Sequence, residues 1–188
     1  MDSTGLLKAF RSDVVDTARP YLWSDEECWR YANDAYRMFV RLTGGVADFL
    51  SEACEIAVTT GEPLVDLHPS ILRIMDATLR STNQPVEVIN STDVGKMRST
   101  DYGQIKQLLL DDKAGRIRYL VHGMQRDKAR LVQVPEVDDF IDLHIYRTPL
   151  DMITGDGQEL TDVAEDHHLH LLDWMKHLAY KKQDADTF

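Results

Sequence analysis

The sequence predicts an α+β protein: an antiparallel helical bundle, made of N-terminal helices and a C-terminal helix, with an inserted antiparallel β region. Three observations predict this fold class. Apolar residues recur every three or four positions over about residues 4–44, the spacing becomes strand-like in the middle of the chain, and helical spacing returns over residues 162–182. We therefore expect residues 1–50 and 160–188 to form the bundle and residues 51–159 to form the β region, within one folding unit.

Two helices are predicted in the first part of the chain. The first should run to Arg19-Pro20, because proline does not continue a helix. Its apolar face consists of Leu6, Leu7, Phe10, Val14 and Ala18. The second should begin at Ser24, since Ser24 and Glu27 have the spacing of a capping box, and should end at Gly44-Gly45. Its apolar face consists of Cys28, Ala32, Ala35, Tyr36, Phe39 and Val40.

The middle of the chain contains segments that read as strands and two that read as short helices. The strand-like segments are 54–60, 71–80, 85–90, 116–122, 129–134 and 139–147. We expect the last three to form an antiparallel meander, because short polar connections separate them. The sequence from Asn90 to Asp93 is expected to cap a short helix that runs to about Arg98, and a second short helix is expected around residues 105–109.

The composition limits the possible functions. Hydrophobic residues make up 43% of the 188 residues, which is enough for a core. The formal net charge is −11 and no Lys/Arg-rich run is present, so the sequence does not predict tight binding of nucleic acid. The apolar runs are short, and we expect neither a transmembrane helix nor a secretory signal. Cys28 and Cys54 belong to no CxxC pair and are expected to be buried free thiols.

The C-terminal helix carries a stripe of acids and histidines. Helical spacing places four of them on one side: Asp166, His170, Asp173 and His177. Histidine and carboxylate are possible ligands of a transition metal, but one helix cannot surround an ion and no HExxH motif supplies further ligands. We favour a solvated or subunit-facing polar stripe, in which each acid can pair with a histidine one turn away. His167 and His168 are expected to pack at the edge of the apolar face.

A second cluster of acids, Asp138, Asp139 and Asp142, lies near the last strand. Paired carboxylates perform acid–base chemistry when they face each other in a cleft, but neighbours on a strand point to opposite sides. We favour turn and edge residues, because charges commonly protect edge strands from unwanted pairing. No glycine-rich phosphate loop and no GxSxG motif is present. The sequence therefore predicts no catalytic residue, no metal and no cofactor.

The order of these features resembles the head-to-tail connector (adaptor) proteins of tailed bacteriophages. The resemblance covers about residues 20–188. It rests on LWSDEECWRYANDAYRMFV (22–40), LHPSILRIMDATL (67–79), GRIRYLVHG (115–123), ARLVQVPEVDD (129–139), the strand end at residues 146–150, and the last helix with Asp173-Trp174-Met175, residues 179–182 and Asp184. It is carried by pattern and order, without a catalytic signature.

The resemblance implies a structural virion protein and no enzyme. It implies a ring, of twelve subunits, that binds below the portal protein, extends the DNA channel and offers a docking platform to the tail or nozzle. DNA would pass without sequence-specific binding, and the ring would assemble in the host cytoplasm. The polar end of the chain, residues 181–188, is the candidate portal contact through Lys181, Lys182 and Phe188, and the stripe of Asp166, His170, Asp173 and His177 is a candidate subunit interface.

Two other classes of function stay open at this point. One is a phage-associated cell-wall hydrolase, whose only support is the acid cluster at residues 138–142. The other is a cytoplasmic regulatory module that uses its helical face as a groove for a partner protein. A zymogram would detect the hydrolase, and a stable monomer that never assembles on a portal would favour the regulatory module.

Overall fold

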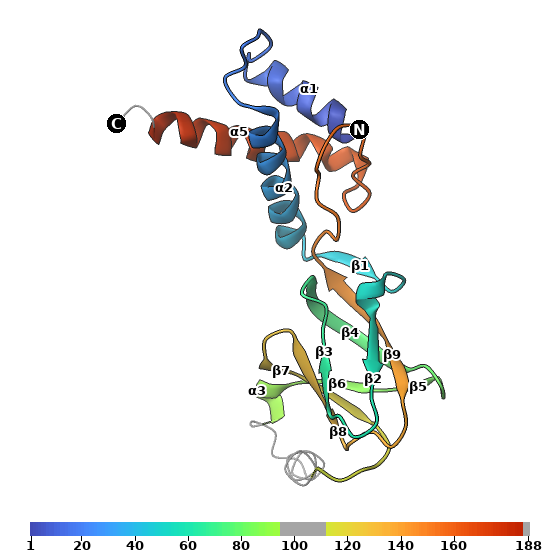
Figure 1. The fold of residues 1–188 in the computed structure, drawn as a ribbon. Coiled ribbons are helices and arrows are strands. Elements are labelled where there is room, and N and C mark those ends of the chain that lie inside the picture. Colours follow the sequence, from blue (N-terminus) through green and yellow to red (C-terminus); the bar gives the residue numbers. More distant parts are fainter. Residues whose placement is uncertain (95–111, 186–188) are drawn as a thin grey trace. The chain divides into compact units, whose positions relative to one another are not determined.

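The computed structural model describes residues 1–94 and 112–185, with side chains as far as Lys181 at the C-terminal end (Figure 1). The chain is mixed α+β and divides into two compact units. The helical unit comprises residues 1–46 and 148–188, and the β unit comprises residues 47–147. The predicted end of a short helix near Arg98 and the predicted helix around residues 105–109 lie outside the described residues.

The first helix, α1 (Ser3–Asp13), is shorter than predicted. Val15, just beyond its end, has a positive φ of 59°, a conformation that breaks the right-handed helical path. The backbone N–H of Asp16 then bonds the carbonyl of Arg11 at 2.9 Å. The expected continuation of the apolar face to Ala18 is therefore wrong, and Ala18 is exposed.

The second helix, α2 (Asp25–Leu42), begins and ends where the sequence predicts. The Glu27 N–H donates to Ser24 Oγ at 3.2 Å, and the Ser24 N–H donates to Glu27 Oε2 at 3.1 Å, so the capping box is complete. At the other end Gly45, with a φ of 101°, donates its N–H to the Val40 carbonyl at 2.8 Å. This left-handed end satisfies helix carbonyls at a position that suits glycine.

The C-terminal helix consists of a short 3₁₀ turn, η2 (Glu165–His167), followed by α5 (His168–Ala185). It starts and ends about three residues later than the predicted range of 162–182. In Figure 1, α5 crosses α2 within the helical unit, and it also contacts α1. The buried residues between these helices include Leu6, Phe10, Cys28, Ala32, Tyr36, Val40, Leu171, Met175 and Ala179.

The loop that leads into η2, residues 148–164, is anchored on the helices by buried polar groups. The Asn33 side chain bonds both backbone groups of Ile153, each at 2.7 Å. The Ser3 hydroxyl donates to the Gly155 carbonyl at 2.7 Å, and Ser3 also exchanges hydrogen bonds with the backbone of Gln158. These hydrogen bonds attach the loop to the helices at Ile153, Gly155 and Gln158.

The β unit contains two sheets. In the five-stranded sheet the order is β1-β9-β4-β5, and β2 also pairs with β9. Its strands are β1 (Val46–Asp48), β2 (Glu55–Val58), β4 (Ile71–Leu79), β5 (Gln84–Pro85) and β9 (Asp139–Arg147). In the four-stranded sheet the order is β3-β8-β7-β6, with β3 (Leu64–Asp66), β6 (Glu87–Asn90), β7 (Tyr119–Gln125) and β8 (Lys128–Val132). Two short helical turns, η1 (Glu52–Cys54) and α3 (Ser91–Val94), complete the unit.

The predicted meander is wrong in its third strand. β7 and β8 form the expected antiparallel hairpin, but β9 lies in the other sheet, between β4 and β1. The segment 85–90 is likewise divided, since only β5 pairs with β4 and β6 pairs in parallel with β7. β9 does alternate strictly, with Ile141, Leu143 and Ile145 in the core, but alternation shows which side of a strand is buried and does not show which strand it pairs with.

Candidate functional site

The four residues of the predicted polar stripe are all exposed. Asp166 lies in η2, whereas His170, Asp173 and His177 lie on α5. Asp173 forms an ion pair at 2.9 Å with Lys176, a residue that also reaches Asp13 of α1 at 3.1 Å. Each histidine lies against an aromatic ring on its own helix rather than against an acid: His170 is 5.8 Å from His167, and His177 is 5.3 Å from Trp174, between ring centroids.

The stripe does not converge on a point that suits a metal ion. Among the side chains of residues 1–94 and 112–181, no three His, Cys, Asp or Glu are close enough to hold one. The stripe instead presents polar groups along one side of α5, as a surface that a neighbouring protein can contact.

The other two histidines of this segment differ from each other. His168 is buried and its Nε2 lies 2.8 Å from the Val163 carbonyl, so it packs in the helical unit as expected. His167 is exposed, and its ring lies 5.6 Å from the ring of Phe39 on α2. His168 therefore joins the N-terminal end of α5 to the loop that precedes it.

The predicted portal contact lies at the end of α5. Lys181 is exposed, and α5 continues to Ala185, so the stretch expected to be a polar tail begins as helix. The side chain of Lys182 and all of Phe188 lie outside the described part of the structure.

The three acids that support the hydrolase alternative each contact a different partner residue. Asp138 accepts the backbone N–H and the hydroxyl of Thr60, both at 2.7 Å. Asp139 accepts from the Ser81 hydroxyl at 2.5 Å, and Asp142 pairs with the guanidinium of Arg80.

These contacts do not suit a general acid. The hydrogen bonds from the Thr60 backbone and hydroxyl lower the pKa of Asp138. Partial burial raises the pKa of Asp139, but its hydrogen bonds to Ser81 and to the Phe140 backbone outweigh burial and lower it overall. A general acid needs the opposite shift, so the contact with Thr60 supports a turn role for Asp138. The expected edge role is wrong for Asp139 and Asp142, because they lie on β9, which pairs with β2 on one side and β4 on the other.

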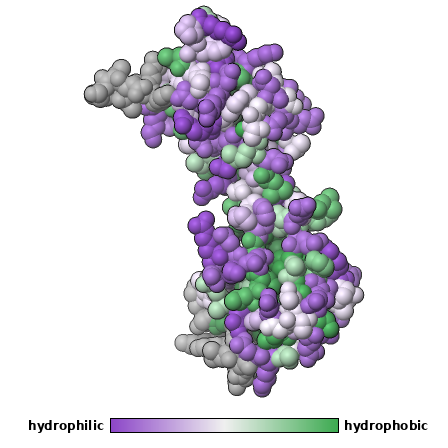
Figure 2. Space-filling view, in the orientation of Figure 1, coloured by the Kyte–Doolittle hydropathy of each residue, from purple (hydrophilic) through white to green (hydrophobic). Residues whose placement is uncertain are grey.

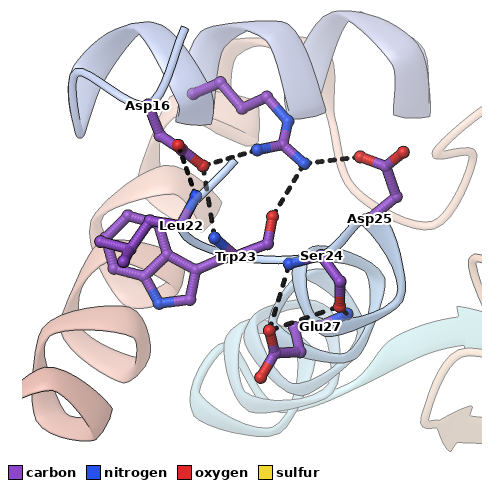
Figure 3. Close-up of polar contacts among 7 residues, drawn as sticks. Asp16, Leu22, Trp23, Ser24, Asp25 and Glu27 are labelled. Carbon is purple, nitrogen blue, oxygen red and sulfur yellow. Dashed lines mark hydrogen bonds and ion pairs between the residues drawn. The ribbon is translucent and has the colours of Figure 1, made fainter. Parts of the chain in front are cut away.

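A buried ion network joins α1 to α2, and the sequence analysis did not find it (Figure 3). Arg11 lies 2.6 Å from Asp16 and 2.5 Å from Asp25, and it also donates to the Trp23 carbonyl at 3.1 Å. Asp16 accepts the backbone N–H of Leu22 at 2.8 Å. Because Arg11 and both carboxylate oxygens of Asp16 are hydrogen-bonded, the network fixes the turn that leads into the capping box of α2.

A second buried pair, Arg147 with Asp48, holds the β1–η1 turn against the end of β9. Asp48 also accepts the backbone N–H groups of Leu50 and Ser51 and the Ser51 hydroxyl at 2.6 Å. Burial raises the pKa of Asp48, but the hydrogen bonds from Ser51, Arg147 and the turn outweigh it and hold the pKa well below its usual range. The burial of Arg147 could have been predicted from the sequence, because it lies at an odd-numbered position of β9, like the buried residues Ile141, Leu143 and Ile145.

Both cysteines are free and buried, as expected. Burial raises the pKa of the Cys28 thiol to about 11, so it stays protonated and unreactive at neutral pH.

The surface of the β unit carries exposed hydrophobic side chains at its turns. Phe49 and Leu50 follow β1 and are 66% and 83% exposed, and Met124 in the β7–β8 hairpin is 58% exposed. In Figure 2 the hydrophobic side chains gather over the β unit, whereas the visible face of the helical unit is mostly hydrophilic. Exposed hydrophobic side chains of this kind mark contact sites for other proteins. Among the described residues, no helix is long and apolar enough to span a membrane.

Comparison with known proteins gives one family. A family model described as SU10 adaptor protein matches residues 1–187 of the chain, which covers both units. None of the curated proteins matches the chain.

Proposed function

Because the chain belongs to the SU10 adaptor protein family, a family of phage head–tail adaptors, we propose that it forms a ring between the portal and the tail. The protein is a structural component of the phage particle. The family match over residues 1–187 carries the proposal, since it includes both the helical and the β unit. The ring has twelve subunits, binds below the portal, extends the DNA channel and provides the docking platform for the tail or nozzle.

Two features of the fold suit a ring. We propose that α1, α2 and α5 act as an antiparallel bundle that packs side by side with its neighbours, and that the β region is an insertion in the same folding unit. Such a ring needs a heterologous interface that closes on itself. The exposed polar stripe of Asp166, His170, Asp173 and His177 supplies polar groups for part of this interface.

The two ends of the ring have different candidate contacts. Lys181, Lys182 and Phe188, at and beyond the end of α5, dock on the portal. Phe49, Leu50 and Met124, exposed at turns of the β unit, are available to the tail or nozzle protein. The formal charge of −11 per subunit repels the phosphate backbone, which lets DNA pass without specific binding.

The proposal is tested by mixing the purified protein with its portal ring and imaging the product by electron microscopy. A closed extra ring below the portal is the expected result. A protein that stays a single subunit in the presence of the portal would rule out the proposed function.

Two truncations test the portal contact. Deletion of residues 183–188 should abolish binding to the portal, whereas deletion of 186–188 alone separates the role of Phe188 from that of the last turn of α5. Circular dichroism of both variants checks that α5 is retained. Unaltered portal binding by the longer deletion would show that the contact lies elsewhere.

A further inference from the structure

The β unit contains a groove lined by two arginines, neither of which has an acidic partner among the described residues. It has a volume of about 750 Å³ and is lined by Met75, Asp76, Gln84, Pro85, Val86, Glu87, Val88, Arg116, Ile117, Arg118 and Tyr119. We call it the arginine groove. Arg116 and Arg118 are exposed and stand on either side of the buried Ile117. Neither guanidinium forms an ion pair with any residue that the structure describes.

Positive charge is concentrated in the stretch of sequence that contains these two arginines, although the whole chain is acidic. Residues 112–130 contain six basic and two acidic side chains, in a chain whose formal charge is −11. Three of the other basic residues are already paired: Lys128 with Asp66 at 2.8 Å, Arg126 with its neighbour, and Arg130 with Asp112. The fourth, Lys113, also has an interaction, so Arg116 and Arg118 are the basic residues of this stretch that are left to bind an external carboxylate or phosphate.

The helical unit carries a segment of opposite charge, the acidic loop of residues 148–164. It contains four carboxylates and no lysine, arginine or histidine. Asp151, Asp156 and Glu159 are exposed, and none of them pairs with a residue in the described part of the chain. The loop also exposes apolar surface at Leu150 and Met152, which are 38% and 41% exposed.

The backbone of the acidic loop is attached to the helices before any partner binds. The hydrogen bonds from Asn33 and Ser3 fix its backbone on the helices, so little conformational entropy is lost when it meets a partner. Its combination of exposed acids and apolar side chains matches a groove that offers arginines beside Met75 and Tyr119. Asp76 and Glu87 also line the groove and repel carboxylates, so the two arginines are the lining groups that attract an acidic partner.

We propose that the arginine groove of one subunit binds the acidic loop of a second copy of this chain, at the contact between neighbours in the ring. The inference rests on the proposed ring. Because the groove and the loop are different surfaces of the chain, their contact is heterologous, which is the kind that can close into a ring. The strongly acidic chain makes DNA the less favourable partner for the two arginines.

Charge reversal tests the contact. In the groove variant Arg116 and Arg118 are replaced by glutamate, and in the loop variant Asp156 and Glu159 are replaced by lysine. Each variant alone should lower the yield of rings on the portal by more than about tenfold, because like charges then face each other. A control with Lys8→Glu and Arg126→Glu changes the net charge as much as the groove variant does, and it should assemble like the wild type.

Two rescue experiments identify the partner. A chain with all four substitutions should form rings again, because the charges are complementary once more. A mixture of the groove variant and the loop variant should also form rings, since subunits that alternate place glutamate against lysine and arginine against carboxylate. Rescue in the four-substitution chain but not in the mixture would place the contact within one chain and overturn the inference.

The remaining outcomes distinguish failure of the proposed function from failure of the inference. If wild-type protein forms no ring on the portal, the proposed function itself fails. If wild-type rings form and the groove variant assembles equally well, the inference fails while the function stands. If, in addition, wild-type rings bind a labelled DNA duplex and groove-variant rings do not, the arginines contact DNA and not a second copy.

Discussion

At the scale of single residues, the structure depends on a few charges that are buried together with their partners. Arg11 and Asp16 are each about 7% exposed, and their contacts order the turn between α1 and α2. Burying a charge is costly unless it is paired and hydrogen-bonded. Loss of one member should therefore cost much more than loss of an exposed charge on the same helix.

Replacement of Arg11 by leucine leaves Asp16 buried without its main partner. We expect the free energy of unfolding to fall by about 3–5 kcal/mol, measured by urea denaturation. The matched control is Lys8→Leu, an exposed position on the same helix, which should change it by less than about 0.5 kcal/mol. The double variant Arg11→Leu with Asp16→Leu should recover part of the loss. Equal effects of Arg11→Leu and Lys8→Leu would contradict a structural role for the network.

The pair of Asp48 and Arg147 makes the stability of the protein depend on pH. The pKa of Asp48 is lower in the folded state than in the unfolded chain, so the pair stabilises the fold above the unfolded pKa of about 4. This stabilisation is lost as the pH falls below about 4 towards the lower folded pKa.

Replacement of Asp48 by asparagine should remove that dependence. The variant should be less stable than the wild type at pH 7, and the difference should shrink as the pH is lowered below about 4. Urea denaturation at a series of pH values measures it. Asp76→Asn, at an exposed position on β4, is the control and should follow the wild type. A difference between Asp48→Asn and wild type that stays constant at all pH values would count against this explanation.

At the scale of secondary structure, local signals predicted the ends of α2 but not the end of α1. The capping box and the glycine pair of α2 act within four or five residues, so their effect is visible in the sequence. The end of α1 depends instead on Asp16, whose carboxylate bonds the backbone of Leu22 and the side chain of Arg11. Such contacts form only when the chain has turned back on itself.

The capping box of α2 gives a prediction at this scale. Ser24→Ala removes the side-chain oxygen that accepts the Glu27 N–H, and we expect a loss of about 1 kcal/mol in the free energy of unfolding. Chemical denaturation followed by circular dichroism measures it. Ser12→Ala makes the same change at an exposed position inside α1 and should not destabilise the protein. A loss in Ser12→Ala as large as that in Ser24→Ala would remove capping as the cause.

Alternation of apolar and polar residues predicted where the strands lie in the sequence better than it predicted which strands pair. The strand-like segments of residues 139–147 and 71–80 correspond to β9 and β4 almost to the residue. In the structure β9 pairs with β4 and not with β8, although Ile74 of β4, Leu131 of β8 and Ile145 of β9 all lie in one buried cluster. Period-two spacing shows which side of a strand is buried, but it does not show against which other strand.

At the scale of the whole molecule, the helical unit is assembled from the two ends of the chain. Its two parts are separated in sequence by residues 47–147, which form the β unit. A folded β unit brings the ends of its chain to defined positions, and an unfolded one makes closure of the helical unit entropically more costly. This coupling supports the proposal of one folding unit, even though each unit has its own buried core.

Calorimetry tests the coupling. A single transition whose calorimetric enthalpy equals its van't Hoff enthalpy is the expected result for the free subunit. The Arg11→Leu variant, which perturbs only the helical unit, should shift the whole transition to lower temperature. Two separate transitions, with only one of them moved by Arg11→Leu, would show that the units unfold independently.

The sequence by itself determined the fold class, the limits of α2, the location of most strands, the burial of both cysteines and the resemblance to phage adaptors. These properties depend on periodicity, capping and order along the chain, which act over short distances. The tertiary structure decided the division of the strands between two sheets, the buried pairs of Arg11 with Asp16 and Arg147 with Asp48, and the position of Arg116 and Arg118 in a groove. Each of these depends on residues that are distant in sequence or on which charges find partners, and only the folded chain specifies that.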